Sequence, residues 1–544
     1  MKKVYLLLFA AFFIANTGSV TAQQIKLSKN VEQALTTVDT AQFKADIAYL
    51  ADDKLLGRMP GTPGYQMAVD YVVDQLKSLN VEPGGENNTW LQQVILRKAF
   101  VHDAVISFDN GQENNIGMRS NKDYAIYPNP AIPQIKISAG LVFAGYGISE
   151  PNLGYDDYAG LDVKGKIILI LRGTPEKLSS SVAAHVMNST QILKVAAEHG
   201  AIGVMICSAD STARLPNFSR GVYSVLDKQG NVAVSRSYYS SQVSVFGGVS
   251  YSLFNMFLKD SGKSMADILA QLRAGQPDSF VINAGINVSY TSSYQDIISY
   301  NVIGKIEGSD PELRNTYVVH SAHLDHLGVG PAVQGDSIYN GAHDNASGVA
   351  SVLAIAKIYK NIQIKPKRSI LLVLLTGEEM GDLGSGYFAK YPTVPVNSIV
   401  ADVNTDMPTI IAPLLSITAL GAEHSSLAKQ VDQAASYLGI SVEPDPEPKQ
   451  ARFTRSDQYS FVLQGIPALH VKYGSKTADG KNNLNDIVAV WRAKYYHKPQ
   501  DDINGIFDFS AGKKYAQLNF LIGYLVAEDK DKPVWNEGDI FSVK

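Results

Sequence analysis

The chain has 544 residues, of which 45% are hydrophobic and 18% are charged, and its formal net charge is −4 at pH 7. This length predicts roughly two or three domains, and the composition is that of a folded globular protein rather than a disordered one. Basic and acidic residues nearly balance, which argues against a general nucleic-acid-binding protein because such proteins carry a basic excess.

The N-terminus has the layout of a secretory signal peptide. Lys2 and Lys3 precede an apolar run at residues 4–15, and small residues follow up to Ala22. The alternative is a membrane anchor, but the run is shorter than the roughly 20 residues that a spanning helix needs. We therefore expect cleavage near Ala22 and an exported protein, periplasmic or extracellular, without stable membrane insertion.

Helices and strands alternate irregularly in the segment that follows the signal. Apolar residues at three-to-four spacing predict a helix at residues 65–79, and another helix is expected at 31–51. Strands are expected at 92–96 and 104–108. A turn-rich loop at residues 57–64 separates the two helices and reads by itself as a simple connector.

Residues 131–280 differ in character from the segments on either side. Short apolar runs separated by Gly, Pro, Asn and Asp predict strands, with one helix among them. Nothing in this segment has the spacing of metal ligands. We therefore expect an inserted β-rich module with its own core, in which the one cysteine, Cys207, is a buried strand residue. The expected strands are residues 141–147, 166–171, 202–207 and 232–235, and the expected helix is 192–199.

Strands and helices alternate from about residue 286 onward, which predicts an α/β domain with a mostly parallel sheet flanked by helices. The run SILLVLL at 369–375 is continuously apolar, as in a strand covered on both faces. The clearest helices are residues 349–358 and 425–438. The expected strands are residues 301–307, 317–321, 369–375, 398–404, 416–420 and 466–471.

The loop after the strand at 317–321 is rich in metal-binding residue types. Imidazole and carboxylate ligands together suit zinc and similar divalent ions. A loop between a strand and a helix lies at the carboxyl edge of a parallel sheet, where open α/β folds bind ligands. The candidates in this loop are His323, Asp325, His326, His343 and Asp344.

Three later segments supply further candidates. Glu378 and Glu379 directly follow the strand at 369–375, and successive side chains on an extended backbone point to opposite sides. One of the two can therefore bind metal while the other faces the substrate. Asp406 follows the strand at 398–404, and His497 comes from a loop near the end of the chain. The alternative for Glu378 and Glu379 is a solvated pair in a loop, and the alternative for His497 is an ordinary loop histidine.

Together these residues match the requirements of a dinuclear site. One carboxylate bridging two ions, with one His and one further carboxylate for each ion, uses every member of the set. Asp325 lies two residues beyond His323 on the same strand face, where it can orient the His323 ring. The set comprises His323 and His497, then Asp344, Glu379 and Asp406, with Glu378 spare. The remaining histidines, interpreted as structural or surface residues, are His320, His326, His343, His424 and His470.

The motifs SAHLDH, GAHDNASG, TGEE, NTDM and YHKPQDD, in this order, resemble those of the M28 family of zinc aminopeptidases and carboxypeptidases. The similarity covers the N-terminal helices, with the LxGRxPGTPG pattern at 55–64, and the chain from about residue 286 onward. Residues 131–280 resemble a protease-associated (PA) domain, which several family members carry as an insertion. The resemblance implies a zinc-exopeptidase-like α/β fold with this inserted domain.

The resemblance also implies roles for individual residues. Asp344 becomes the bridging ligand, Glu378 the general base, and Asp325 the residue that orients His323. Tyr496 is a candidate donor to the oxyanion of the tetrahedral intermediate. The implied ligands of two Zn²⁺ ions are His323, Asp344, Glu379, Asp406 and His497. Two positions depart from the family pattern, because His343 stands where many members have Asp and Gln458 ends a segment that reads Ser-Asp-His in the family.

The sequence therefore predicts an exported dinuclear zinc exopeptidase that acts on peptide substrates, with an aminopeptidase as the leading hypothesis. Glutamate carboxypeptidase-like or dipeptidase activity is the alternative within the same class. A glutaminyl cyclase is disfavoured because those enzymes use one ion, and a non-catalytic binding protein is disfavoured because no ligand or base is lost. The expected domains are residues 1–22 (signal), 23–130 and 281–544 (peptidase domain), and 131–280 (PA-like insertion).

Overall fold

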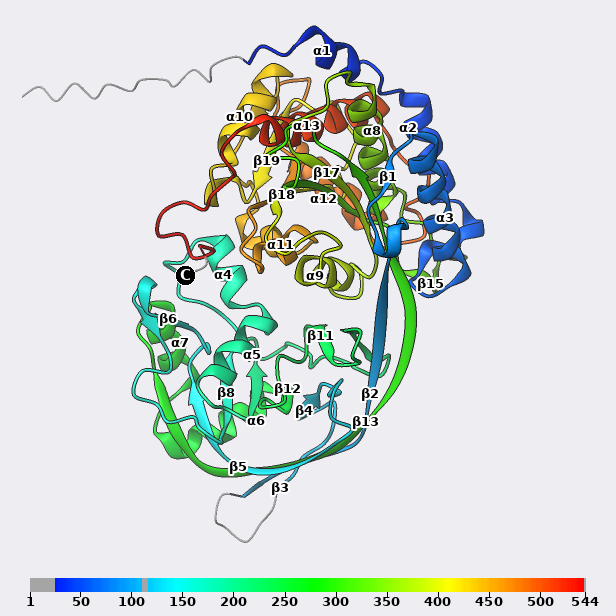
Figure 1. The fold of residues 1–544 in the computed structure, drawn as a ribbon. Coiled ribbons are helices and arrows are strands. Elements are labelled where there is room, and N and C mark those ends of the chain that lie inside the picture. The colour runs from blue at the N-terminus through cyan, green and yellow to red at the C-terminus, as the bar shows by residue number, and fades with distance from the viewer. Residues whose placement is uncertain (1–24, 110–115, 543–544) are drawn as a thin grey trace, which may run out of the picture.

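The computed structural model describes residues 25–109 and 116–542, so the expected signal peptide lies outside the described residues. Figure 1 shows two lobes joined by a pair of long strands, β2 (Leu91–Asp109) and β13 (Ser279–Ile306). We call residues 25–90 together with 307–542 the large lobe, and residues 116–278 the insert lobe. Each lobe has its own hydrophobic core.

The large lobe is built on a mixed sheet whose central strands are parallel. Strand β17 pairs with β14, β14 with β18, and β18 with β21, all in parallel. Strand β13 pairs antiparallel with β17 on one side, and β19 pairs antiparallel with β21 on the other. The strands are β1 (Glu82–Pro83), β14 (Tyr317–His323), β17 (Ser369–Leu375), β18 (Ile399–Asn404), β19 (Ser416–Leu420), β20 (Ser441–Val442) and β21 (Ala468–Tyr473), with a separate hairpin of β15 (Gly328–Val333) and β16 (Asp336–Tyr339).

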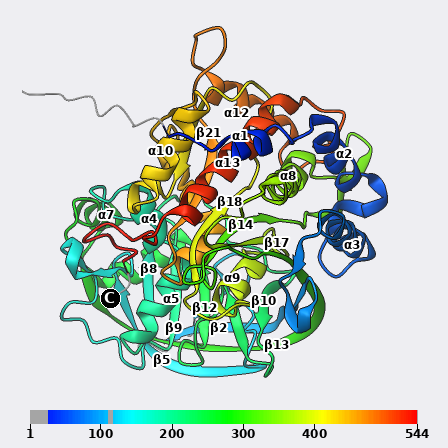
Figure 2. The same ribbon diagram turned by 45° about the horizontal axis from the view of Figure 1, so that its top comes forward.

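Helices cover both faces of this sheet (Figure 2). One face packs against α8 and α13, and the other against α9 and α11. Every residue of β17 and β18 is buried as a result. The helices are α1 (Lys29–Leu35), α2 (Thr40–Leu50), α3 (Pro63–Ser78), α8 (Ser347–Asn361), α9 (Leu383–Lys390), α10 (Ala428–Tyr437), α11 (Gln458–Val462), α12 (Leu484–Tyr495) and α13 (Phe509–Glu528).

The insert lobe contains a second set of parallel strands. Strands β5, β8, β9 and β12 pair in parallel in that order, and β5 pairs antiparallel with β13. The strands are β3 (Ile116–Gly117), β4 (Tyr124–Ile126), β5 (Gln134–Ala144), β6 (Ser149–Glu150), β7 (Tyr155–Asp156), β8 (Ile167–Leu171), β9 (Gly203–Cys207), β10 (Val222–Leu226), β11 (Val232–Ser235) and β12 (Val245–Val249), and the helices are α4 (Ser180–Val186), α5 (Ser189–Glu198), α6 (Tyr251–Leu258) and α7 (Met265–Arg273).

The predicted α/β fold with a mixed sheet flanked by helices is confirmed, and Cys207 is a buried strand residue as expected. Two local predictions are wrong. The helix expected at 31–51 is divided into α1 and α2, because the Asp39 carboxylate accepts a hydrogen bond from the Ala41 amide at 2.9 Å and caps the second helix. The two strands expected at 92–96 and 104–108 are one strand, β2, because the residues between them also pair with β13.

Helices α12 and α13 lie where the sequence patterns predict no helix. Among residues 25–109 and 116–542, no helix combines the length and the apolar character needed to span a bilayer.

Candidate metal centre

The site residues that follow strands lie at the carboxyl ends of adjacent parallel strands. His323 is the last residue of β14, Glu378 and Glu379 come after β17, and Asp406 comes after β18. Because β14 lies between β17 and β18, these ends meet at one edge of the sheet. This is the edge at which open α/β sheets bind ligands.

Asp344 lies at the centre of the group, in the short helical turn Ala342–Ala346 that precedes α8. One of its carboxylate oxygens, Oδ1, is 3.3 Å from His323 Nε2. The other, Oδ2, is 3.2 Å from His497 Nε2. The two oxygens of one carboxylate therefore face two different imidazoles.

Each imidazole also faces a second carboxylate. Asp406 Oδ1 is 3.3 Å from His323 Nε2, and Glu379 Oε2 is 3.3 Å from His497 Nε2. The structure thus brings together all five predicted ligands as two groups that share Asp344. The donor set fits divalent cations of the zinc type, because imidazole nitrogens and carboxylate oxygens converge in each group.

His326 belongs to this arrangement, although the sequence pattern places it among the structural histidines. Its ring is buried, and its Nδ1 is 2.6 Å from Glu379 Oε1. Ligand atoms of His326, Asp344 and Glu379 converge closely enough to hold a metal ion. Within residues 25–109 and 116–542, the close contact between His326 Nδ1 and Glu379 Oε1 does not meet hydrogen-bond geometry, and His326 Nε2 has no hydrogen-bond partner either, as expected of atoms that face a cation. Its spacing of three residues from His323 is the one sequence signal that marks it.

Asp325 makes a different contact from the one predicted. Its carboxylate is 4.0 Å from His323 Nδ1, which is too long for a hydrogen bond, whereas its backbone carbonyl is 3.2 Å from that nitrogen. The carboxylate instead accepts hydrogen bonds from the amides of Glu378 at 3.2 Å and Glu379 at 3.4 Å. The backbone of Asp325 therefore orients His323, while its side chain holds the two glutamates in place.

Arg58 is a buried positioning residue. In the sequence it is marked only as the arginine of the LxGRxPGTPG pattern, with no role of its own. Its Nε donates to the Leu324 carbonyl at 2.9 Å, and its Nη1 and Nη2 donate to the carbonyls of Asn340 at 2.6 Å and Gly341 at 3.1 Å. The guanidinium also donates to the Leu50 carbonyl. One side chain thus ties the loop after His323 to the turn before Asp344. Burial lowers the pKa of Arg58 to about 10, against the effect of nearby carboxylates.

Asp501 supports the same turn from the other side. Its two carboxylate oxygens accept hydrogen bonds from the amides of His343 and Asp344, each at 3.0 Å. Burial raises the pKa of Asp501 to about 6. The neighbouring His343 ring stacks on Phe507 at 4.0 Å, and its Nε2 lies 3.0 Å from the Ile506 carbonyl. His343 is therefore a packed structural residue, as predicted.

The second departure from the family pattern, Gln458, is also accommodated by hydrogen bonds. Its Nε2 donates to the Phe453 carbonyl at 2.6 Å, and its Oε1 accepts from Asn404 Nδ2 at 3.0 Å. The side chain is fully buried and leaves the ligand set unchanged.

The charges of the site are strongly coupled. Burial alone would lower the pKa of His323, but the carboxylates of Glu378 and Asp344 outweigh it and raise this pKa well above its usual value. Burial opposes ionisation of Asp344, yet hydrogen bonding to His323 and His497 holds its pKa well below the usual range. The Asp344 carboxylate is therefore ionised, the form that binds metal.

Glu378 differs from the carboxylates that face the imidazoles. Burial raises its pKa well above the usual value for glutamate, and the charges of Asp406 and Glu379 act in the same direction, against that of His323. Glu378 lines a cavity of about 800 Å³ together with Tyr496 and His497. The Tyr496 ring stacks on His497 with centroids 3.8 Å apart, so its position is coupled to a predicted ligand. A half-buried carboxyl with a raised pKa at a cavity wall has the properties of a general base.

Comparisons with known proteins bear on this site. Residues 301–518 match the model of Peptidase family M28. The chain is 26% identical over 323 residues to the probable leucine aminopeptidase 2 of Aspergillus fumigatus, an alignment that covers 55% of this chain and 59% of the relative. It is 25% identical over 245 residues to carboxypeptidase Q of Rattus norvegicus, covering 42% of this chain and 47% of the relative.

Among solved structures, an aminopeptidase from Aneurinibacillus sp. strain AM-1 matches 92% of this chain and 99% of its own, with a TM-score of 0.48 and 19% identity. The chain spans 59% and 58% of the first two curated relatives that it matches. The resemblance to family M28 is confirmed over residues 301–518. The assignment of residues 131–280 to a PA-like domain stays a prediction.

Proposed function

We propose that the protein is an exported dinuclear zinc exopeptidase that removes N-terminal residues from peptides. The observation that carries this proposal is the position of Asp344, whose two oxygens lie 3.3 and 3.2 Å from the imidazole nitrogens of His323 and His497. Such a carboxylate is suited to bridge two ions. The proposed zinc ligands are His323, Asp344, Glu379, Asp406 and His497, with His326 beside Glu379.

Two zinc ions held here would polarise the scissile carbonyl and acidify the attacking water. The chain itself supplies the proton transfers. Glu378, with its raised pKa, accepts the proton of the attacking water and passes it to the leaving amine. Asp325 keeps Glu378 in place through the 3.2 Å hydrogen bond to its amide. Tyr496, at the wall of the same cavity, donates a hydrogen bond to the oxyanion that forms on the substrate.

Carboxypeptidase or dipeptidase activity is the second candidate. It is favoured by the similarity to carboxypeptidase Q, which extends to the human protein at 29% identity over 239 residues. Both activities require the same hydrolytic chemistry and differ only in which end of the peptide occupies the cavity.

The test combines metal analysis with a substrate panel. We expect purified protein to contain about two zinc ions per chain. We expect it to hydrolyse an aminoacyl-anilide, and to be inactive on a peptide with a blocked N-terminus and a free C-terminus. Cleavage of the blocked peptide alone would replace the aminopeptidase by a carboxypeptidase. Protein that binds zinc stoichiometrically but cleaves neither substrate would be a binding protein on a peptidase scaffold.

Export is tested separately by fractionation of cells that express the full chain. We expect the protein in the periplasm or medium, with an N-terminus near Gln23 determined by mass spectrometry. Uncleaved protein in the cytoplasm would contradict the signal assignment.

A further inference from the structure

The cavity beside the candidate metal centre is walled by both lobes. Glu378, Glu379 and His497 border it from the large lobe. From the insert lobe come the residues that follow β8, β9 and β12, namely Arg172, Ser208 and Ser250. The carboxyl ends of the insert's parallel strands therefore face the catalytic edge of the large lobe across a single cavity.

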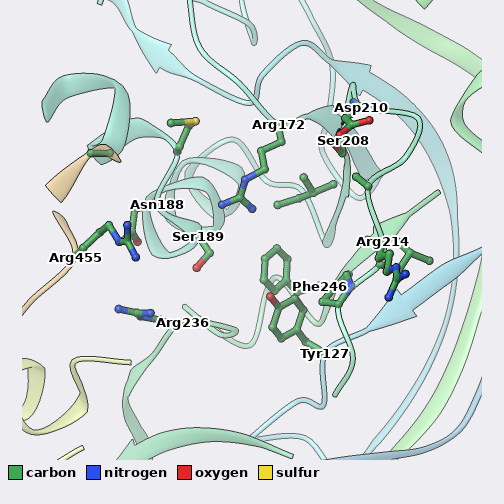
Figure 3. A pocket seen from close by; sticks show the side chains of 18 of the residues that line it. Tyr127, Arg172, Asn188, Ser189, Ser208, Asp210, Arg214, Arg236, Phe246 and Arg455 are labelled. Carbon is green, nitrogen blue, oxygen red and sulfur yellow. Dashed lines mark hydrogen bonds between the residues drawn. The ribbon is translucent and has the colours of Figure 1, made fainter. Parts of the chain in front are cut away.

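Arginine side chains gather in this cavity, as Figure 3 shows. Arg172 and Arg214 come from the insert lobe and Arg455 from the large lobe, and all three are exposed. Within residues 25–109 and 116–542, none of the three forms a hydrogen bond or ion pair through its guanidinium. A fourth, Arg236, is neutralised by an ion pair with Asp382. Three cationic side chains thus border one cavity with their donors free.

Helix ends add to the positive potential of the insert wall. The cavity is lined by Asn188 and Ser189 at the N-terminus of α5, and by Ser250 and Tyr251 at the N-terminus of α6. Backbone amides at a helix N-terminus carry partial positive charge and attract anions. The arginines and the two helix N-termini therefore act in the same direction.

The acidic residues of the lining offset only part of this field, although Asp210 lies on the insert wall with Arg172 and Arg214. On the insert wall, the Asp210 carboxylate accepts hydrogen bonds from the amide and hydroxyl of Thr212, at 2.8 and 2.7 Å. Glu378 and Glu379 lie at the other end, beside the proposed metal ligands. The cavity is thus polarised, with carboxylates at the hydrolytic end and unpaired guanidinium groups around the remainder.

We propose that this cavity binds a free carboxylate of the substrate, so that the enzyme prefers short peptides that carry one. This inference rests on the proposed peptidase function and names its substrate class. A cavity of about 800 Å³ is within the size range of sites that enclose drug-sized ligands, which a short peptide matches. A guanidinium binds a carboxylate through two parallel hydrogen bonds, and that carboxylate is either the C-terminal group or an acidic side chain.

Arg455 has the most direct position for this role. It borders both the large cavity and a smaller pocket of about 50 Å³ that is also lined by Asp344, Asp406 and Tyr496. Arg172 and Arg214 line the large cavity but not the smaller pocket, and would meet the carboxylate of a longer peptide. Arg455, which borders the pocket shared with Asp344 and Asp406, is therefore expected to select the shortest substrates.

The test measures binding in the Glu378→Gln background, in which turnover is slow. Calorimetry compares Leu-Gly-Gly with its C-terminal amide and with Leu-Gly-Asp amide. We expect the free acid to bind about tenfold more tightly than the neutral amide, the weight of a charge-assisted hydrogen bond. For this tripeptide Arg455→Gln should remove the difference, whereas Arg220→Gln, which changes an exposed arginine outside the cavity, should keep it.

The three peptides distinguish a C-terminal carboxylate from the carboxylate of an acidic side chain. Tighter binding of Leu-Gly-Asp amide than of the free acid Leu-Gly-Gly would assign the arginines to an acidic side chain. Equal affinity for all three peptides, or an equal loss in the Arg220 variant, would overturn the proposal. Hydrolysis of the neutral amide by the unmodified protein tests the peptidase function independently. Failure of the carboxylate proposal therefore leaves the peptidase proposal standing, and the reverse also holds. Thermal melting of each variant checks that the fold is intact.

Discussion

The two lobes share an arrangement of parallel strands that end at one cavity, but they place groups of opposite charge there. In both, parallel strands end at the shared cavity, but the large lobe places imidazoles and carboxylates there, whereas the insert lobe places arginines and helix N-termini. The edge of a parallel sheet collects loops from distant parts of the sequence, so its chemistry is set by loop residues rather than by the strands. Under the two proposals above, the large lobe provides the reactive groups, and arginines of both lobes recognise the carboxylate of the substrate.

Contacts between the lobes complement the β2–β13 pair. His185 Nδ1 lies 2.7 Å from the Tyr459 hydroxyl, and His424 Nε2 lies 2.7 Å from the Ser181 hydroxyl. Phe541, near the C-terminus, packs between His185 and His424. These contacts fix the cavity walls relative to each other, which is required if both lobes act on one substrate.

The largest expected effect tests the assignment of reactive groups to the large lobe. Glu378→Gln should lower kcat by about 10²- to 10⁴-fold, the usual contribution of a general base, while zinc content is unchanged. Asp344→Ala should lose both metal and activity, because it removes the shared carboxylate. Steady-state kinetics with metal analysis by mass spectrometry checks both variants. Normal turnover by the Glu378 variant would remove it from the mechanism.

A pair of core substitutions tests whether the lobes are separate folding units. Phe520→Ala in the large lobe and Phe254→Ala in the insert lobe each delete a fully buried ring and should cost about 3–5 kcal/mol. All three tryptophans, Trp90, Trp491 and Trp535, lie outside the insert lobe. Urea unfolding followed by tryptophan fluorescence should therefore shift for Phe520→Ala, and shift little for Phe254→Ala.

Far-UV circular dichroism supplies the control for that pair, because it reports both lobes. For Phe254→Ala it should show an early transition that fluorescence does not follow. Coincident transitions by both probes in both variants would instead show that the lobes unfold as one cooperative unit.

Acid should destabilise the large lobe through its buried histidines. Burial lowers the pKa of His320 to about 3, whereas the unfolded chain has a pKa of about 6.5. Since the unfolded state binds the proton first, the contribution of His320 to stability is constant above pH 6.5 and falls between pH 6.5 and 3, by up to about 1.4 kcal/mol per pH unit. His320→Gln should flatten this dependence, measured by melting temperature against pH with a chelator present. An unchanged slope would contradict the assignment.

The smallest effect concerns the ion pair between the lobes. Arg236 pairs with Asp382, but its side chain is 49% exposed, so Arg236→Gln should cost less than about 1 kcal/mol. A double-mutant cycle with Asp382→Asn, followed by urea unfolding, measures the coupling. A coupling energy well above this value would mean that the ion pair, more than the β2–β13 strands, holds the lobes together.

Local patterns predicted the large lobe well. The continuously apolar run at Ser369–Leu375 is a central strand, and the residues expected at strand ends, His323, Glu379 and Asp406, do lie at one edge of the sheet. Patterns failed where pairing depends on distant partners. Nothing between residues 97 and 103 indicates that β2 continues there, since the partner that extends it is β13, far along the chain.

The sequence by itself determined the ligand types, their order along the chain and their place after strands, because residue chemistry and apolar periodicity are local properties. Tertiary structure decided which groups meet. It placed His326 against Glu379 and joined two site loops through Arg58. It brought the Glu378 amide to the Asp325 carboxylate, which accepts its hydrogen bond. It also brought Arg172 and Arg455 to one cavity from different lobes. Such meetings depend on how the chain packs over long separations, which no local pattern records.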